Sequence, residues 1–184
     1  MKCFGRGLNL AVALLAISGL STWGATESPP SAGDVLSQAE AQAAAGHKEI
    51  FLIFGASWCG WCKRLDKFDQ SPGVSAILQR NFVIAHLTVE EHGDKAVLDN
   101  RGAQELMSKL GGAGGLPFFA FLDSGGKMIV NSNRPANGKP GDTNIGFPAE
   151  PEEVAWFMAM LNKAVPSLTP EDAKAIEDQI RALR

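Results

Sequence analysis

The sequence lacks the features that mark several large classes of protein. It has only three cysteines in 184 residues, which excludes a fold held together by several disulfides. Its formal net charge is -3, which argues against binding to nucleic acid, where a basic face must meet the phosphates. Its longest apolar stretch, residues 8–20, is shorter than the roughly 20 residues that a membrane-spanning helix needs. Hydrophobic residues make up 45%, which allows a packed core, and the length suits one domain.

The first 25 residues have the pattern of a signal peptide. Lys2 and Arg6 give a positive start, an apolar run follows, and small residues offer cleavage after Gly24 or Ala25. We therefore expect residues 1–25 to be removed and the mature protein to be periplasmic or secreted, with no stable insertion in a membrane. The alternative interpretation is a buried N-terminal helix.

The mature chain keeps one pair of cysteines, Cys59 and Cys62. A disulfide that closes so short a loop constrains the unfolded chain little, so chemistry explains the pair better than stability does. Residues 26–33 are rich in proline and serine and predict a flexible linker, and residues 34–184 are expected to form one domain. The mature net charge is about -5, because the removed segment holds two basic residues and no acidic one.

Hydrophobic periodicity predicts alternating helices and strands in this domain. Helices are expected at residues 34–45, 59–68, 74–79, 96–110, 152–164 and from 170 to about 183. Strands are expected at residues 49–54, 82–89, 117–122 and 127–131. Gly46 is expected to end the first helix. This order predicts an α/β fold, with a mixed sheet and helices on both of its faces.

Two segments near the C-terminus leave alternatives open. Residues 133–150 are rich in proline and glycine and predict a long loop, in which Ile145 and Phe147 look exposed. This loop is either a docking surface for a protein partner or a tolerated insertion. The last helix has an apolar stripe that contacts the core or forms a dimer surface, so the oligomeric state stays open. The stripe consists of Ala173, Ile176, Ile180 and Leu183.

The chemistry is expected at Cys59 and Cys62, which follow a buried strand at the start of a helix. The first turn of a helix has unsatisfied N–H groups and about half a positive charge, and both stabilise a thiolate. Lys63 and Arg64 add cations nearby. We therefore assign Cys59, at the tip of the helix, as the nucleophile and Cys62, one turn inward, as the resolving cysteine.

The neighbours of the pair are expected to bind substrate. Gly60 keeps the tip of the helix accessible, and Trp58 and Trp61 flank the sulfurs with large apolar surfaces. Two other interpretations of the cysteine pair are half a zinc site and an inert structural bridge. A zinc site would need two further ligands, and the histidines show no paired metal spacing, so no metal and no cofactor are expected.

Two segments carry a resemblance to a known family. Residues 50–64 (IFLIFGASWCGWCKR) resemble the active-site segment of the thioredoxin superfamily, and residues 116–122 (LPFFAFL) resemble its cis-proline strand. The resemblance covers residues 34–164 and is greatest to exported bacterial thioredoxin-like proteins. It implies a four- or five-stranded sheet flanked by helices, with an extra C-terminal helix here, and thiol–disulfide exchange. It also implies a cis bond before Pro117, which leaves the backbone of Leu116 free to pair with an extended substrate; the alternative is an ordinary trans proline at the start of an edge strand.

The sequence departs from the family at the positions that move protons. Ile53 stands where many thioredoxins bury an aspartate that helps to move a proton from the resolving cysteine. His86 aligns with a lysine near that cysteine, and we hypothesise that it supplies part of the missing proton transfer. The alternative is a strand histidine with a local hydrogen bond.

The resemblance and the motif together predict a thiol–disulfide oxidoreductase of extracytoplasmic proteins. Its partners would be protein thiols and disulfides and an upstream redox protein, and the direction of electron flow is not readable from the dipeptide between the cysteines. The alternative function is a thioredoxin-like binding module, most sharply one that handles copper through Cys59, Cys62 and His86 without turnover.

Overall fold

The computed structural model describes residues 28–136 and 139–184 of the chain. The predicted signal peptide and the first two residues of the predicted linker therefore lie outside the described residues. Within the described part, no helix combines the length and the apolar character of a membrane span.

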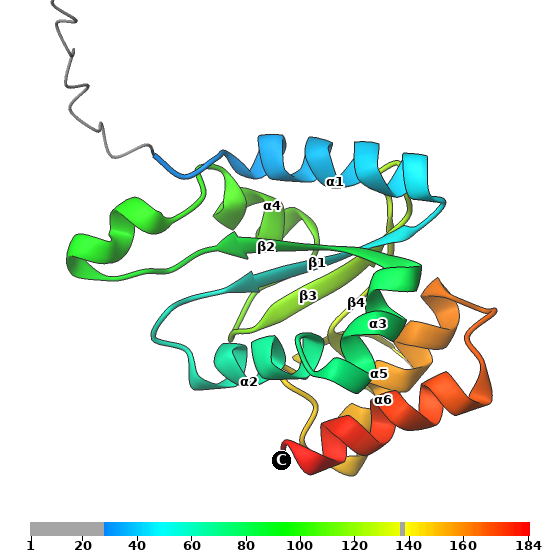
Figure 1. The fold of residues 1–184 in the computed structure, drawn as a ribbon. Coiled ribbons are helices and arrows are strands. Elements are labelled where there is room, and N and C mark those ends of the chain that lie inside the picture. Colours follow the sequence, from blue (N-terminus) through cyan, green and yellow to red (C-terminus); the bar gives the residue numbers. More distant parts are fainter. Residues whose placement is uncertain (1–27, 137–138) are drawn as a thin grey trace, which may run out of the picture.

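A four-stranded mixed sheet in the order β2–β1–β3–β4 forms the centre of the fold (Figure 1). The central strand β1 (Glu49–Gly55) pairs in parallel with β2 (Phe82–Thr88) and antiparallel with β3 (Phe118–Leu122). β3 in turn pairs antiparallel with β4 (Met128–Asn131). The α/β architecture with a mixed sheet, predicted from the order of elements, is confirmed.

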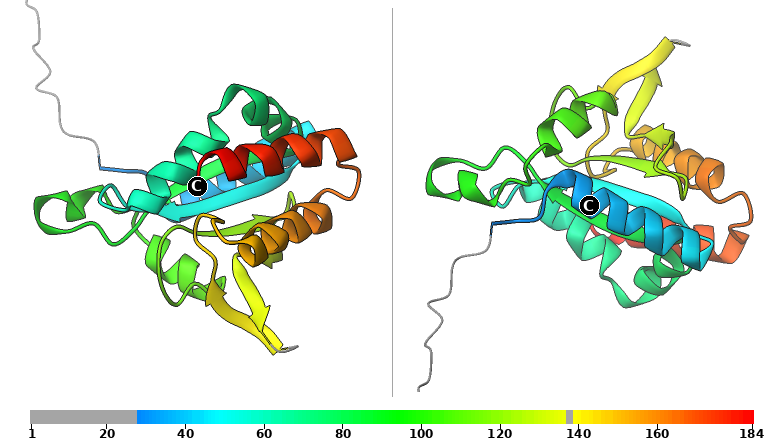
Figure 2. Two further views of the ribbon diagram at one scale, coloured as in Figure 1. Left: turned by 90° about the horizontal axis from the view of Figure 1, so that it is seen from below. Right: turned by 90° about the horizontal axis from the view of Figure 1, so that it is seen from above.

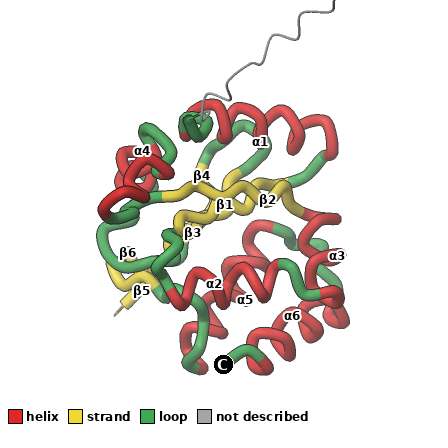
Figure 3. The backbone as a smooth tube through the Cα atoms, turned by 60° about the vertical axis from the view of Figure 1, so that its left-hand side comes forward, coloured by secondary structure: helices red, strands yellow, loops and turns green. Residues whose placement is uncertain are grey.

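Helices cover both faces of this sheet (Figure 1, Figure 3). One face carries α1 (Ala32–Gly46) and α4 (Ala103–Lys109). The opposite face carries α2 (Gly60–Asp69), α3 (Pro72–Asn81), α5 (Pro151–Ala164) and α6 (Pro170–Ala182). The sheet thus lies between two apolar layers, as the family resemblance implies.

The continuous apolar run of β1 has a simple explanation in this arrangement. Side chains alternate between the two faces of a strand, and both faces are covered. Ile50, Leu52 and Phe54 pack in the layer of α1, while Phe51 and Ile53 pack in the layer of α2, α5 and α6. The strand therefore has no solvated face on which polar residues would alternate.

The predicted helix at residues 96–110 is wrong in its first half. The segment begins with a 3-10 helix, η1 (Gly93–Leu98), and only its second half is the α-helix α4. Asn100 breaks the helix because its side-chain oxygen accepts the Thr88 N–H at 2.7 Å and its amide donates to the Pro30 carbonyl at 2.8 Å. Gly102 then adopts φ 82°, which lies outside the helical region.

The predicted loop at residues 133–150 contains a second, two-stranded sheet. β5 (Asn133–Ala136) pairs antiparallel with β6 (Lys139–Asn144), and the hairpin projects from the domain (Figure 2). Ile145 and Phe147, which look exposed in the sequence, are instead buried, at 5% and 3% exposure, in the core that contains α5. The expectation failed for Phe147 because its ring packs against Trp61 and Phe68 of α2, which is distant in sequence.

The two ends of the described chain differ in smaller ways from the predictions. α1 begins at Ala32, inside the predicted linker, and Ser31 caps it through a reciprocal pair of hydrogen bonds with Asp34. His47, rather than Gly46, ends α1 in the left-handed conformation, with φ 51°. At the C-terminus, Ile176 and Ile180 are fully buried, which confirms that the apolar stripe of α6 contacts the core.

Candidate active site

The two cysteines form a disulfide at the start of α2, where the sequence predicts a reactive pair. Cys59 is the N-cap residue of α2, and its sulfur accepts the backbone N–H of Cys62 at 3.0 Å. The sulfur therefore takes the place of a capping oxygen and satisfies one of the N–H groups that the first turn leaves unpaired. Cys59 and Cys62 are 4% and 5% exposed, so burial does not distinguish the predicted nucleophile from the predicted resolving cysteine.

Two half-exposed tryptophans border the disulfide. Trp58 donates its indole N–H to the Glu90 carbonyl at 2.7 Å and stacks on His92, with ring centroids 5.2 Å apart. Trp61 stacks on Phe147 at 6.2 Å, and the Arg64 guanidinium lies 4.9 Å from its ring centroid. The tryptophans are therefore fixed from opposite sides, Trp58 by the segment after β2 and Trp61 by the segment after β6.

The loop before the disulfide is held by a buried carboxylate that the sequence analysis missed. Glu91 accepts hydrogen bonds from the backbone N–H of Ser57 and, at 2.8 Å, from the Ser57 hydroxyl. Lys95 donates to the same hydroxyl at 3.2 Å. The Ser57 N–H is the main reason that the pKa of Glu91 is lowered from its ordinary value, because it stabilises the ionised carboxylate. No sequence pattern links Glu91 to Ser57, since α2, α3 and β2 lie between them in the chain.

The predicted substrate-binding residues of the second segment lie beside the disulfide. The Leu116–Pro117 peptide bond is cis, and Leu116 packs against the small cluster that contains both cysteines. Asn144 holds this turn, because its amide donates to the carbonyls of Gly115 and Pro117 at 2.9 and 3.0 Å. Gly60 has open space around it. The structure thus brings all the predicted substrate-binding residues to one end of the sheet.

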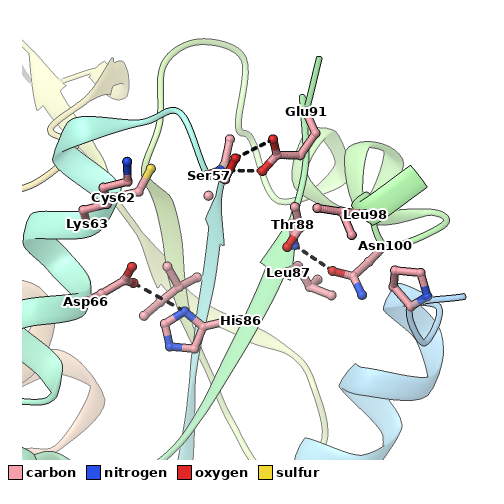
Figure 4. Close-up of a pocket in the computed structure, with 14 residues that line it drawn as sticks. Ser57, Cys62, Lys63, Asp66, His86, Leu87, Thr88, Glu91, Leu98 and Asn100 are labelled. Atoms are coloured by element: carbon pink, nitrogen blue, oxygen red, sulfur yellow. Dashed lines mark hydrogen bonds and ion pairs between the residues drawn. The ribbon is translucent and has the colours of Figure 1, made fainter. Parts of the chain in front are cut away.

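His86 lines a cavity that also contains Cys62 (Figure 4). The cavity has a volume of about 530 Å³ and lies between α2 and β2. His86 pairs in register with Ile53, so the histidine and the apolar residue that replaces the family's aspartate are direct neighbours. The imidazole nitrogens face two carboxylates of α2, with Nε2 3.2 Å from Asp69 Oδ2 and Nδ1 3.8 Å from Asp66 Oδ1.

The pKa values of His86 and Asp66 in this cavity are raised, whereas the pKa of Glu91 at the Ser57 loop is lowered. Hydrogen bonding to Asp69 raises the pKa of His86, and the charges of both aspartates add to this effect against the cost of burial. Burial raises the pKa of Asp66, while the neighbouring His86 opposes the rise. Asp66 and Asp69 were not among the residues predicted from the sequence, although their spacing of three residues on a helix indicates that they share a face.

Comparisons with known proteins show a family and several solved structures to which this chain is similar. A family model described as thioredoxin-like matches residues 32–124. A disulphide isomerase from Xylella fastidiosa Temecula1 is similar in structure, at 21% identity and a TM-score of 0.46, over 86% of this chain and 98% of that one. A DsbH oxidoreductase is similar at 19% identity and a TM-score of 0.41, over 83% and 96%. A thioredoxin-fold protein from Helicobacter pylori is similar at 18% identity and a TM-score of 0.38, over 74% and 84%.

The fold and the family match define the class of this protein. Because the match spans just over half of the chain, the protein belongs to the thioredoxin-like family. A thioredoxin-like fold with a bonded cysteine pair at the start of a helix supports, in general, the chemistry of a thiol–disulfide oxidoreductase.

Proposed function

We propose that this protein exchanges disulfides with protein substrates outside the cytoplasm, with Cys59 as the nucleophile and Cys62 as the resolving cysteine. The observation that supports the proposal most directly is the position of the Cys59 sulfur. It caps α2 and accepts the Cys62 N–H at 3.0 Å, and after reduction the same N–H group would stabilise a thiolate.

The exchange proceeds in two balanced steps. In the reduced protein the Cys59 thiolate attacks a substrate disulfide, which forms a mixed disulfide and releases one substrate thiolate. The Cys62 thiolate then attacks the Cys59 sulfur, re-forms the bond between the two cysteines and releases the second substrate thiol. Two electrons pass to the substrate. The reverse sequence oxidises a substrate dithiol, and the relative potentials of the protein and its partner set the direction.

The surface around the disulfide suits an extended polypeptide. Trp58 and Trp61 offer half-exposed aromatic faces on either side, and Gly60 leaves the tip of α2 open. Leu116 and Pro117 border the pair from the next segment of the sheet. We assign these five residues to substrate binding, with the backbone of Leu116 as the pairing edge for the substrate.

The proposed location follows from the N-terminal sequence. A positive start, an apolar run and small residues make residues 1–25 a signal peptide, so the mature protein is exported to the periplasm or secreted. Residues 34–184 are then the working domain. Its partners are protein thiols and disulfides and an upstream redox protein that resets the pair.

A trapping experiment tests the roles of the two cysteines. Cys62→Ser removes the resolving thiol, so it accumulates a mixed disulfide with a disulfide-containing substrate such as insulin, visible on a non-reducing gel. Cys59→Ser, the matched control, accumulates none and loses insulin reduction in the presence of dithiothreitol, by at least about 100-fold. Turnover that survives in Cys59→Ser contradicts the proposal. An absence of turnover together with tight binding of Cu(I) supports the copper-handling alternative instead.

A further inference from the structure

A second group of reactive side chains lies apart from the disulfide, between α2 and β2. Asp66 and Asp69 are three residues apart on α2 and face His86 of β2. One ligand atom from each of the three lies within 4.8 Å of the other two. The closest pair is His86 Nε2 and Asp69 Oδ2, at 3.2 Å. Figure 4 shows Asp66 reaching across the cavity toward the imidazole.

The charges in this group are unbalanced. Among the described residues, neither Asp66 nor Asp69 has a lysine or arginine within ion-pair distance, and His86 is the one basic partner of both. The Asp69 side chain is only 3% exposed, and its Oδ1 has no hydrogen-bond partner in the described part of the protein. A buried carboxylate with an unsatisfied oxygen is costly, and a neutral imidazole satisfies it with one N–H at most. A bound cation would remove this imbalance.

We propose that Asp66, Asp69 and His86 bind a divalent transition-metal ion of the Zn²⁺ type, at a site separate from the cysteine pair. Each residue contributes one ligand, and water completes the coordination. Ligand atoms around a tetrahedral Zn²⁺ lie about 3.3 Å apart, so the widest of the three separations, within 4.8 Å here, needs to close by up to roughly 1.5 Å. One imidazole nitrogen and two carboxylate oxygens suit zinc better than Ca²⁺ or Mg²⁺, which take oxygen ligands, or Cu(I), which takes thiolates.

The group is accessible to an ion and to its water ligands. His86 lines the cavity of about 530 Å³ that contains Asp66, and also a second cavity of about 330 Å³ that contains Asp69. The imidazole therefore stands between two open spaces, although Asp69 itself is buried. Cys62 also lines the larger cavity, so the site lies beside the cysteine pair, but none of its three ligand atoms is a sulfur.

Zinc titration of a variant without thiols tests the site. In Cys59→Ser/Cys62→Ser, isothermal calorimetry with Zn²⁺ alone at pH 8 is expected to show one ion bound per chain. Adding His86→Ala or Asp69→Asn to this background is expected to weaken binding at least 10-fold. Asp66→Asn, at a half-exposed position, gives a second measurement if Asp69→Asn fails to fold. His47→Asn and Asp178→Asn, remote from the site, are the matched controls and are expected to keep full affinity.

Three results would overturn the metal site. The first is no binding of Zn²⁺ at millimolar concentration, and the second is binding that persists unchanged in both His86→Ala and Asp69→Asn. The third is a native protein that binds no Zn²⁺ and in which His86→Ala nevertheless alters the pH dependence of disulfide exchange. That result would support the proton-transfer role predicted from the sequence. Because the titration uses a variant that cannot exchange disulfides, its outcome does not depend on the proposed function.

Discussion

Glu91 shows how a single side chain fixes the approach to the disulfide. Its carboxylate accepts two hydrogen bonds from Ser57, and its own backbone N–H donates to Asp99 Oδ1 at 3.1 Å. The neighbouring Glu90 has a positive φ of 59° and offers its carbonyl to Trp58. This turn after β2 therefore holds both Ser57 and Trp58, and the loop before Cys59 has little freedom.

The lowered pKa of Glu91 predicts a pH-dependent contribution to stability. A carboxyl group whose pKa is lower in the folded than in the unfolded state stabilises the fold above its unfolded value, here near 4.5. That contribution is lost as the pH falls through the folded pKa. Glu91→Gln is therefore expected to lower the free energy of unfolding at pH 7, and its difference from wild type should vanish well below pH 4.

Urea denaturation at several pH values measures this difference. Glu105→Gln, on the exposed surface of α4, is the matched control for a change of the same type away from the site. A stability difference for Glu91→Gln that is as large at pH 3 as at pH 7 would show that the Ser57 contact owes nothing to ionisation.

The turn between α4 and β3 illustrates packing at the scale of elements. The five residues 111–115 contain four glycines, and their surroundings differ. A Cβ on Gly112 would lie 2.5 Å from Met107 Cγ, 3.0 Å from Phe118 Cδ1 and 3.1 Å from the Met107 carbonyl. A Cβ on Gly114 would meet nothing within 4 Å. Close contact with α4 and β3, rather than turn conformation, therefore requires glycine at position 112.

Replacing each of these two glycines by alanine should change the free energy of unfolding by very different amounts. Gly112→Ala is expected to lower the free energy of unfolding by about 1–3 kcal/mol, since the new methyl group must displace buried neighbours. Gly114→Ala should change it by no more than about 0.5 kcal/mol. Chemical denaturation of both variants gives the comparison, and equal effects would mean that the turn moves freely away from Phe118.

At the scale of the whole molecule, α6 completes the second face of the sheet. Ile176 and Ile180 belong to the same core as Phe51, Phe119 and Phe157. The Thr169 hydroxyl caps the start of the helix by accepting the Asp172 N–H at 3.1 Å. The C-terminal helix is therefore an integral part of the domain rather than an appendage.

This position predicts a large effect of a single truncation in α6. Ile176→Ala is expected to cost about 2–5 kcal/mol of unfolding free energy, because the residue is fully buried and its neighbours cannot close the cavity completely. Val97→Ala is the control, since Val97 is 73% exposed on η1 and should change stability by about 0.5 kcal/mol or less. Thermal or urea unfolding measures both. An Ile176→Ala variant as stable as Val97→Ala would mean that α6 contributes nothing to the core.

Much of the fold was predictable because its signals are local. The apolar run of β1 reflects burial along the whole strand, and the periodicity of α5 reflects the burial of one side along the whole helix. The prediction failed where contacts with other segments of the chain determine the local structure. Asn100 breaks a helix by bonding Thr88 and Pro30, and β5 pairs with β6 in a segment whose prolines and glycines indicate a loop.

The sequence by itself determined the order of the α-helices and of the four strands of the main sheet, the cysteine pair at the start of a helix and the glycine and tryptophans beside it, since each depends on neighbours a few residues away. The tertiary structure alone decided that Phe147 stacks on Trp61 and that Glu91 holds Ser57. It also decided that His86 meets Asp66 and Asp69. These contacts join segments that are separated along the chain, and only the pairing of strands and the packing of helices on the sheet brings them together.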